Sequence, residues 1–318
     1  MIGILKRQTV IVLLFICFFP TMAVAQVDQF KLKQVLQDAN AGDISACAYL
    51  GKMYYEGTGV AQNYNEAFKW FQKAADKGID DACAYLGKMY YEGTGVAQNY
   101  NEAFKCFQKA ADNGVTGAYT WLGVMYYDGQ GVAQNYEKAF LWTKKAAENG
   151  AANAYVGLGV MYCNGQGVVQ NYNEAFKWYQ KAADNGAADA YVGLGVMYCK
   201  GQGVAKNSNE AFKWFQKAAD NGVASAFAYL GDMYYAGDGV AQNYNEALKW
   251  YQKAADNGIT TGIYYFLADM FYTGKTGITD YSQAKKYAEL AIKNDTLDIV
   301  GHRILAKLYM YGYAVEKI

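Results

Sequence analysis

Apolar side chains recur at helical spacing in two successive segments near the start of the chain, and a glycine-rich turn separates them. In residues 45–56, Ala46, Leu50 and Tyr54 lie on one face of a helix. The segment between Asn63 and Gly78 has the same two-sided character, so the pattern predicts a helix-turn-helix unit. Its second helix directs Ala67, Trp70, Phe71, Ala74 and Ala75 inward and Lys69, Gln72, Lys73 and Asp76 outward.

This unit returns along the chain with a constant step, which from Gly51 to Gly87 is 36 residues. A fixed period of this size is typical of a solenoid, because each unit buries its apolar face only against its neighbours. The predicted fold class is all-α, an α/α superhelical solenoid of about seven helix-turn-helix repeats with capping helices. The recurring pairs are Leu50/Gly51, Leu86/Gly87, Leu122/Gly123, Leu158/Gly159, Leu194/Gly195 and Leu230/Gly231.

Glycines and asparagines mark the ends of the predicted helices. Gly57 permits positive φ after the first helix, and Gly78 stands where a left-handed residue ends the second. Asn63, with Glu66 three residues later, predicts a capping box at the start of the second helix. A glycine within a helix costs about 1 kcal/mol of helix propensity. The recurrence of Gly51 therefore predicts that another backbone packs closely against it.

The two ends of the chain depart from the repeat. Residues 26–42 predict an N-terminal capping helix, residues 43–294 the repeat array, and residues 295–318 a C-terminal capping helix. Because each repeat packs only on its neighbours, we expect the array to form one elongated domain.

Residues 1–25 are predicted to be a signal peptide. A basic start at Lys6 precedes an almost wholly apolar run at residues 9–19, and Ala23-Val24-Ala25 fits the small-residue cleavage motif. We therefore expect cleavage after Ala25 and a periplasmic or secreted protein without a stable membrane span. A retained anchor is less favoured, because a span needs about 20 residues. Acylation of Cys17 would instead make the chain a lipid-linked assembly factor, which stays an alternative.

The charge balance argues against a nucleic-acid partner. The chain has 29 basic and 29 acidic residues, and loss of Lys6 and Arg7 with the signal peptide leaves 27 basic residues. The lysines recur beside Glu and Asp, whereas phosphate binding needs a basic stripe. We therefore expect no nucleic-acid binding.

Cysteine usage predicts neither disulfides nor a metal site. Cysteines at equivalent positions of neighbouring repeats lie about one helix spacing apart, roughly 8–10 Å, whereas a disulfide needs Cα atoms within about 7 Å. Cys106 stands where the first repeat has Trp70 and is interpreted as a small apolar filler. With His302 as the only histidine, no metal or cofactor is expected. The equivalent cysteines are Cys47 with Cys83 and Cys163 with Cys199.

The residues of the 36-residue repeat resemble the Sel-one-like repeat family, which is related to tetratricopeptide repeats. The pattern of this family is A-x-x-x-L-G-x-x-Y-x-x-G-x-G-V, then a capping Asp or Asn, then K-A-x-x-W-x-x-K-A-A-x-x-G. The resemblance covers about residues 43–294, with Glu66 in place of the pattern's lysine. It implies an α/α superhelix and an adaptor that holds other proteins, without a common active site. Some exported cysteine-rich relatives carry disulfides around the inter-repeat loops and bind or slowly cleave β-lactams. Here Ala39 and Ala75 stand near the place of the first cysteine of such a pair.

The alternative function, a cell-wall-related enzyme or β-lactam binder, rests on the cysteine-rich relatives, and two short motifs that would support it are accidental matches. Ser282-Gln283-Ala284-Lys285 matches S-x-x-K and Lys275-Thr276-Gly277 matches K-T-G, which are boxes of penicillin-recognising serine enzymes. Their order is reversed relative to those enzymes, and both stand where the repeat needs a turn and a helix start. We therefore predict no catalytic residue and no enzymatic activity.

Positions that differ between repeats are the candidates for partner binding. Variable positions are expected to be released from stacking, and first helices usually line the concave face of such an array. This predicts a groove with a bare floor at Gly157 and Gly193. The alternative is that harmless positions drifted after duplication of the repeat. The candidate partner-binding residues are Tyr49, Tyr85, Trp121, Tyr229, Lys52 and Lys88. The position of Lys52 and Lys88 is occupied in later repeats by Val124, Val160, Val196 and Asp232.

Together these features predict an exported, non-enzymatic scaffold for protein–protein interaction that uses the concave face of the array. Tyr and Trp supply a large contact area at low entropic cost, which suits a protein or peptide partner and also a cell-wall glycan.

Overall fold

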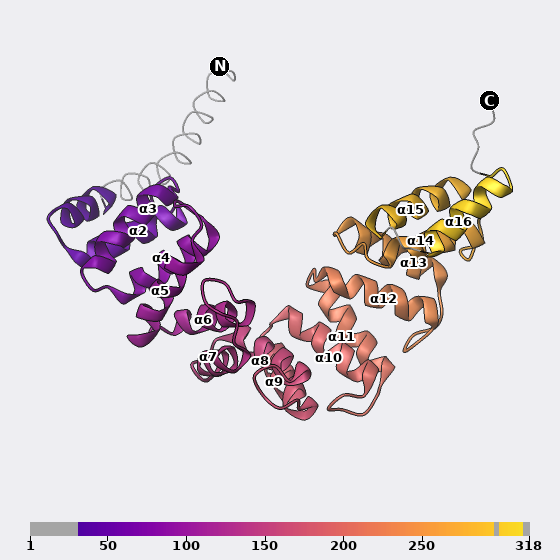
Figure 1. Cartoon of the computed structure of the whole chain (residues 1–318), viewed down its shortest axis with the longest axis horizontal. Coiled ribbons are helices and arrows are strands. Elements are labelled where there is room, and N and C mark those ends of the chain that lie inside the picture. Colours follow the sequence, from indigo (N-terminus) through magenta and orange to yellow (C-terminus); the bar gives the residue numbers. More distant parts are fainter. Residues whose placement is uncertain (1–30, 296–298, 314–318) are drawn as a thin grey trace, which may run out of the picture. The chain divides into compact units, whose positions relative to one another are not determined.

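A computed structural model of the chain describes residues 31–295 and 299–313, so the predicted signal peptide and its cleavage site lie outside the described residues. Over the described residues all regular secondary structure is helical (Figure 1). Residues 31–40 are helical. The later helices are α2 (Ile44–Glu56), α3 (Tyr64–Asp76), α4 (Asp80–Glu92), α5 (Tyr100–Asp112), α6 (Thr116–Asp128), α7 (Tyr136–Glu148), α8 (Ala152–Asn164), α9 (Tyr172–Asp184), α10 (Ala188–Lys200), α11 (Ser208–Asp220), α12 (Ala224–Ala236), α13 (Tyr244–Asp256), α14 (Ile263–Thr273), α15 (Tyr281–Asn294) and α16 (Ile299–Met310).

Consecutive helices pair as the predicted repeats. Repeat 1 consists of α2 and α3, repeat 2 of α4 and α5, and so on to repeat 7, which consists of α14 and α15 (Figure 1). Each first helix packs along the second helix of its own repeat, as α2 does on α3, and α3 then contacts α4 of the next repeat. The predicted all-α solenoid of helix-turn-helix repeats is thus confirmed.

The chain divides into two compact units, Met1–Ala151 and Ala152–Ile318. Unit 1 holds repeats 1–3, and unit 2 holds repeats 4–7 together with α16. The sequence predicts one elongated domain, whereas the contacts group the repeats into two units. Each unit is therefore described by itself below.

Asparagine and glycine form the helix ends as predicted, but half of the expected capping box is absent. The side-chain oxygen of Asn63 accepts a hydrogen bond from the backbone N–H of Glu66 at 3.1 Å, and Gly57 has a φ of 73°. The Glu66 carboxylate instead pairs with Lys69 at 2.7 Å. The backbone N–H of Asn63 donates to the carbonyl of Tyr54 at 2.9 Å. The reciprocal bond from Glu66 is therefore not needed, and that part of the prediction is wrong.

In repeats 1, 2, 4, 5 and 6 the glycine in the middle of the first helix packs against an aromatic ring, not against the backbone that the sequence predicts. In repeat 3, Gly123 lies instead against Thr143 and its backbone. In repeat 5, a Cβ atom on Gly195 would lie 2.6 Å from Cε1 of Phe215, a ring with 0% of its surface exposed. In repeat 7 the equivalent residues are Ala268 and Ala288, which belong to one fully buried cluster. A methyl group thus replaces the glycine hydrogen only where the ring is also lost.

The last helix covers the end of unit 2. Ile304 and Leu308 of α16 are buried in one cluster with Ala268, Ala284 and Ala288 of repeat 7. This helix therefore caps repeat 7 through apolar contacts, in agreement with its predicted place at the end of the array.

Candidate functional site

Three of the predicted binding residues stack on rings of the preceding repeat. The ring centroids lie 4.5 to 5.4 Å apart, and the ring planes are within 9° of parallel. The expectation that this position is released from stacking is therefore wrong, because at these three junctions the first helix lies over a ring of the preceding second helix. A binding role for their exposed edges stays a prediction. The pairs are Tyr85 on Phe71, Trp121 on Phe107 and Tyr229 on Phe215.

The other three candidates lie at the surface of unit 1. Tyr49 is 41% exposed, and the ammonium of Lys31 lies 5.5 Å from its ring centroid. Lys52 and Lys88 each approach a glutamate four residues later, at 3.8 Å and 3.9 Å. Hydrogen bonding to Tyr55 raises the pKa of Lys88, which keeps this side chain cationic. Nothing in these contacts tests a binding role, which stays a prediction.

The series of stacked ring pairs is interrupted at two successive junctions between repeats. Thr143 and Gly157 replace both rings at the junction where the two units meet in sequence. At the next junction, within unit 2, Tyr179 keeps its ring and Gly193 replaces the stacking residue. A Cβ atom on Gly193 would lie 2.7 Å from Cε1 of Tyr179, whose side chain is only 7% exposed. Gly193 thus lets the ring approach the backbone of α10.

A hollow of about 550 Å³ opens beside Gly193. Its walls come mainly from the first helices α8 and α10, so the predicted bare floor at Gly193 does border a concavity. None of the six candidate binding residues lines it, and Gly157 does not line it either. The apolar lining consists of Val156, Val160, Val192, Val196, Met197, Cys163 and the two tyrosines Tyr172 and Tyr179, and the polar lining consists of Asn164, Gln170, Asp189, Lys200, Gln202 and Ser225.

The chemistry of the hollow suits an apolar group with a polar surround. Burial raises the pKa of the Cys163 thiol although its hydrogen bond with Tyr179 and the nearby Lys200 lower it, so the thiol is neutral at neutral pH. Asp189 and Lys200 contribute one charge of each sign. The described part of the chain holds no group of three or more His, Cys, Asp or Glu side chains that could bind a metal.

The repeat position that Lys52 holds in repeat 1 is valine in the hollow, at Val160 and Val196, and is an aspartate in repeat 6, at Asp232. The carboxylate of Asp232 accepts a hydrogen bond from the hydroxyl of Tyr251 at 2.8 Å. Tyr251 is 0% exposed, and burial, reinforced by Asp232, raises the pKa of its phenol. This variable position therefore satisfies a buried polar group in repeat 6.

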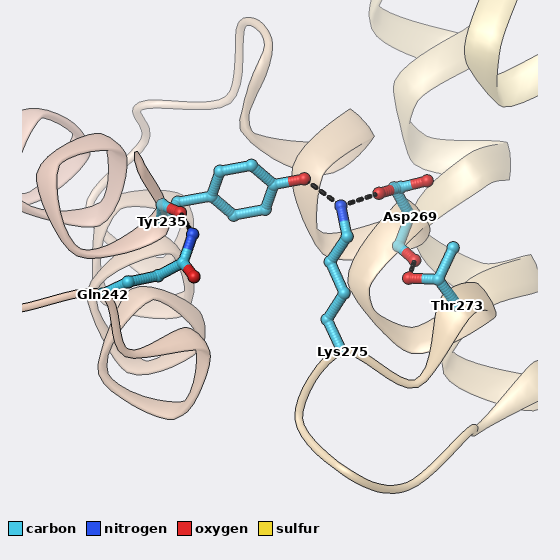
Figure 2. Close-up of polar contacts among 5 residues, drawn as sticks. All are labelled: Tyr235, Gln242, Asp269, Thr273 and Lys275. Carbon is cyan, nitrogen blue, oxygen red and sulfur yellow. Dashed lines mark hydrogen bonds and ion pairs between the residues drawn. The ribbon is translucent and has the colours of Figure 1, made fainter. Parts of the chain in front are cut away.

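The K-T-G motif forms structural contacts in unit 2. Figure 2 shows the Lys275 ammonium between the Tyr235 hydroxyl and the Asp269 carboxylate, which it contacts at 2.9 Å. Partial burial lowers the pKa of Lys275, but hydrogen bonds with Tyr235 and Asp269 raise it more, and the net pKa lies above the usual value. The side-chain amide of Gln242 donates a hydrogen bond to the backbone carbonyl of Tyr235. The hydroxyl of Thr273 donates one to the backbone carbonyl of Asp269. A lysine held as an ammonium in this way is a poor proton acceptor.

We expect the mature protein to show no turnover of a chromogenic β-lactam, because Lys275 is engaged and Ser282 lies exposed at the start of α15. The measurement is the hydrolysis rate of purified residues 26–318 against buffer, with Ser282→Ala as the matched variant. Turnover in the unsubstituted protein that disappears in the variant would contradict this expectation.

The described cysteines are all free thiols. They are Cys47, Cys83, Cys106, Cys163 and Cys199. None of the helices between residues 31 and 313, outside the gap at 296–298, combines the length and apolar character needed to cross a bilayer.

The profile of the Sel1 repeat matches seven segments of the chain, at residues 44–79, 80–115, 116–150, 152–186, 188–223, 224–259 and 264–295. These segments cover most of the chain, so the protein belongs to the Sel1 repeat family. This confirms the resemblance drawn from the sequence. Sel1 repeat proteins generally mediate protein–protein interactions.

Two solved structures show the same fold at substantial sequence identity. A Sel1 repeat protein from Oxalobacter formigenes is 34% identical, with a TM-score of 0.69 over 78% of this chain and 100% of that one. A protective antigen present in uropathogenic Escherichia coli strains, displaying an SLR fold, is 30% identical, with a TM-score of 0.66 over 90% of this chain and 68% of that one. No curated protein matches the chain.

Proposed function

We propose that the chain is an exported, non-enzymatic scaffold that binds a protein partner through the first helices of unit 2. The hollow beside Gly193 receives an apolar side chain of that partner. The observation that carries this proposal is the loss of a stacking residue at Gly193, which leaves a concavity where the other ring-bearing junctions are filled.

The walls of the hollow favour a protein partner over a glycan. Four valines from α8 and α10 line it, and of its two tyrosines Tyr179 is only 7% exposed and Tyr172 is half-buried. Sugar rings are commonly held on open aromatic faces, whereas valine walls gain affinity by removing apolar surface from water. The amide side chains in the lining can in turn bond the polar backbone around the inserted side chain.

Export rests on the basic start, apolar run and cleavage motif of residues 1–25. The Escherichia coli relative is described as a protective antigen, which accords with a place outside the cytoplasm. The leader motif in addition supports a mature chain that begins at Gln26.

Val196→Asp is expected to weaken partner binding at least about tenfold, because a buried, unpaired carboxylate costs more than about 1–3 kcal/mol. In repeat 6 the same helix position carries Asp232, which Tyr251 bonds, whereas repeat 5 has Phe215 in place of that tyrosine. Urea unfolding of the variant is therefore measured in parallel, to separate loss of binding from loss of stability. A photo-crosslinking residue is placed at Val196 in the mature protein to identify the partner in envelope extract. The affinity of the purified partner for the protein is then measured by calorimetry.

The matched control is Val124→Lys, at the same position of repeat 3 and 37% exposed. It copies Lys52 and Lys88 and lies in the other unit, so partner affinity should be unchanged. Equal affinities for Val196→Asp and the unsubstituted protein would refute the proposed site.

A further inference from the structure

Most repeats hold a pair of aromatic rings between their two helices. In repeats 3 to 6 a first-helix Tyr or Phe stacks on a second-helix Trp, with centroids 5.7 to 5.9 Å apart. A lysine three residues after each Trp lies over both rings, at 4.3 to 4.4 Å from the first centroid and 5.0 to 5.2 Å from the Trp centroid. The pairs are Tyr119/Trp142, Tyr155/Trp178, Tyr191/Trp214 and Phe227/Trp250.

Repeat 2 has lost both rings of this pair. Cys83 stands in place of the first-helix ring and Cys106 in place of the Trp. A hollow of about 270 Å³ opens there, between α3, α4 and α5 of unit 1, and both cysteines line it. Cys106 therefore does not fill the space left by Trp, in contrast to the interpretation from the sequence.

The lysine that covers the rings elsewhere is still present in repeat 2. Lys109 lines the hollow and donates a hydrogen bond to the backbone oxygen of Ala75 at 3.3 Å. Its ammonium thus remains at the hollow without rings beneath it. Burial raises the pKa of the Cys106 thiol to about 11, so this part of the lining is uncharged at neutral pH.

The hollow also offers aromatic contacts from the neighbouring helices. Phe68 of α3 and Tyr90 of α4 both line it and pack edge to face, with centroids 5.3 Å apart. Lys105 and Glu102, also in the lining, form an ion pair at 2.7 Å. Cys106 is only partly buried, so the hollow opens to the surface.

We propose that this hollow binds a tryptophan side chain of a protein partner, whose indole takes the place that Trp holds in the other repeats, beneath Lys109. An indole rather than an aliphatic side chain is favoured because a cation over a ring face is attracted by the ring quadrupole, most strongly for Trp. The chain itself provides the template, since the same position is occupied by Trp142 under Lys145 in repeat 3. This site is separate from the hollow beside Gly193 and does not depend on it.

The test uses fluorinated N-acetyl-tryptophanamide and the mature full-length protein, with binding followed by ¹⁹F NMR. We expect the probe to bind the unsubstituted protein at millimolar concentrations and not to bind Cys106→Trp, which fills the hollow with the chain's own ring. Lys109→Ala should weaken binding several-fold. Lys145→Ala, the matched control, should leave it unchanged, because that lysine covers a ring pair already in place.

Binding lost in Cys106→Trp and weakened in Lys109→Ala supports the proposal. Absence of binding to the unsubstituted protein, equal binding to Cys106→Trp, or equal weakening by Lys145→Ala overturns it. N-acetyl-leucinamide is the aliphatic comparison, and its binding as tightly as the tryptophan probe would overturn the choice of an aromatic ligand.

Discussion

Gly195→Ala is expected to destabilise the protein although alanine is the better helix former. The new Cβ would lie 2.6 Å from Cε1 of Phe215. That ring is fully buried and stacks on Tyr229 at 4.5 Å, so it has little room to move. Overpacking of a core costs about 1–3 kcal/mol, and the gain in helix propensity offsets about 1 kcal/mol of it. Urea unfolding followed by circular dichroism measures the lowered free energy of unfolding.

Gly117→Ala is the matched control for this substitution. Gly117 lies in α6, and a Cβ atom there would meet nothing within 4 Å. The change should be neutral or stabilising by up to about 1 kcal/mol. In a Phe215→Ala background, Gly195→Ala should lose its cost, because the pair then reproduces Ala268 and Ala288 of repeat 7. Equal costs of Gly195→Ala in both backgrounds would contradict this account of the clash.

Asp232→Val is expected to lower the free energy of unfolding by about 1–3 kcal/mol, because it leaves the hydroxyl of Tyr251 buried without its acceptor. Adding Tyr251→Phe should recover most of the loss. The double variant reproduces the combination of Val196 and Phe215 that repeat 5 already holds. A double-mutant cycle in urea measures the coupling, and additive effects of the two substitutions would rule out this role for Asp232.

The pH dependence of stability gives a second readout for the same pair. Partial desolvation raises the pKa of Asp232, and the hydrogen bond from Tyr251 lowers it by less, so the folded-state pKa lies above the unfolded value. The folded state therefore binds the proton more tightly. The stability gained from this tighter proton binding by Asp232 is fully present below the unfolded pKa of about 3.9. It is lost as pH rises through the folded-state pKa of Asp232. Asp232→Val should remove this fall in the free energy of unfolding with rising pH, while the remaining pH dependence of stability is retained.

The helix ends and the repeat were predictable because their signals are local. Asn63 caps a backbone N–H only three residues away, and Gly57 adopts the left-handed conformation that ends its own helix. The same applies to the 36-residue step, which is visible in the sequence without knowledge of any contact. Family membership therefore follows from the local sequence signals alone.

The errors arose where a residue's role depends on a partner in another helix. Recurrence of Gly51 indicated close packing, but not that the neighbour is the ring of Phe71. Variation at Tyr85 was interpreted as freedom from stacking, whereas the ring of Phe71 lies directly against it. Tyr85 and Phe71 lie in different helices. The periodicity within one helix therefore does not indicate that the two residues are in contact.

The two hollows had sequence signals of unequal strength. Gly193 stood out because it replaces a ring at a repeated position, but Val156 and Val192 look like ordinary helix residues. Cys83 and Cys106 each replace a ring, and comparison with Tyr119 and Trp142 at the equivalent positions could have linked them. That link requires knowing that the two positions face each other across the repeat.

Part of the hollow of repeat 2 comes from a stretch of sequence that the chain contains twice. Residues 46–69 and 82–105 are identical, and Cys47 and Cys83 hold the same place in the two copies. Recombination between the two copies in the gene would delete residues 70–105, which removes one whole repeat together with Trp70. The shortened protein would join Cys47 to a second helix that carries Cys106. Such a deletion would therefore shorten the array by one step and keep a pair of cysteines, while the α3 wall of the hollow, with Gln72, Ala75 and Asp76, would be lost and the helix at residues 31–40 would precede the pair instead.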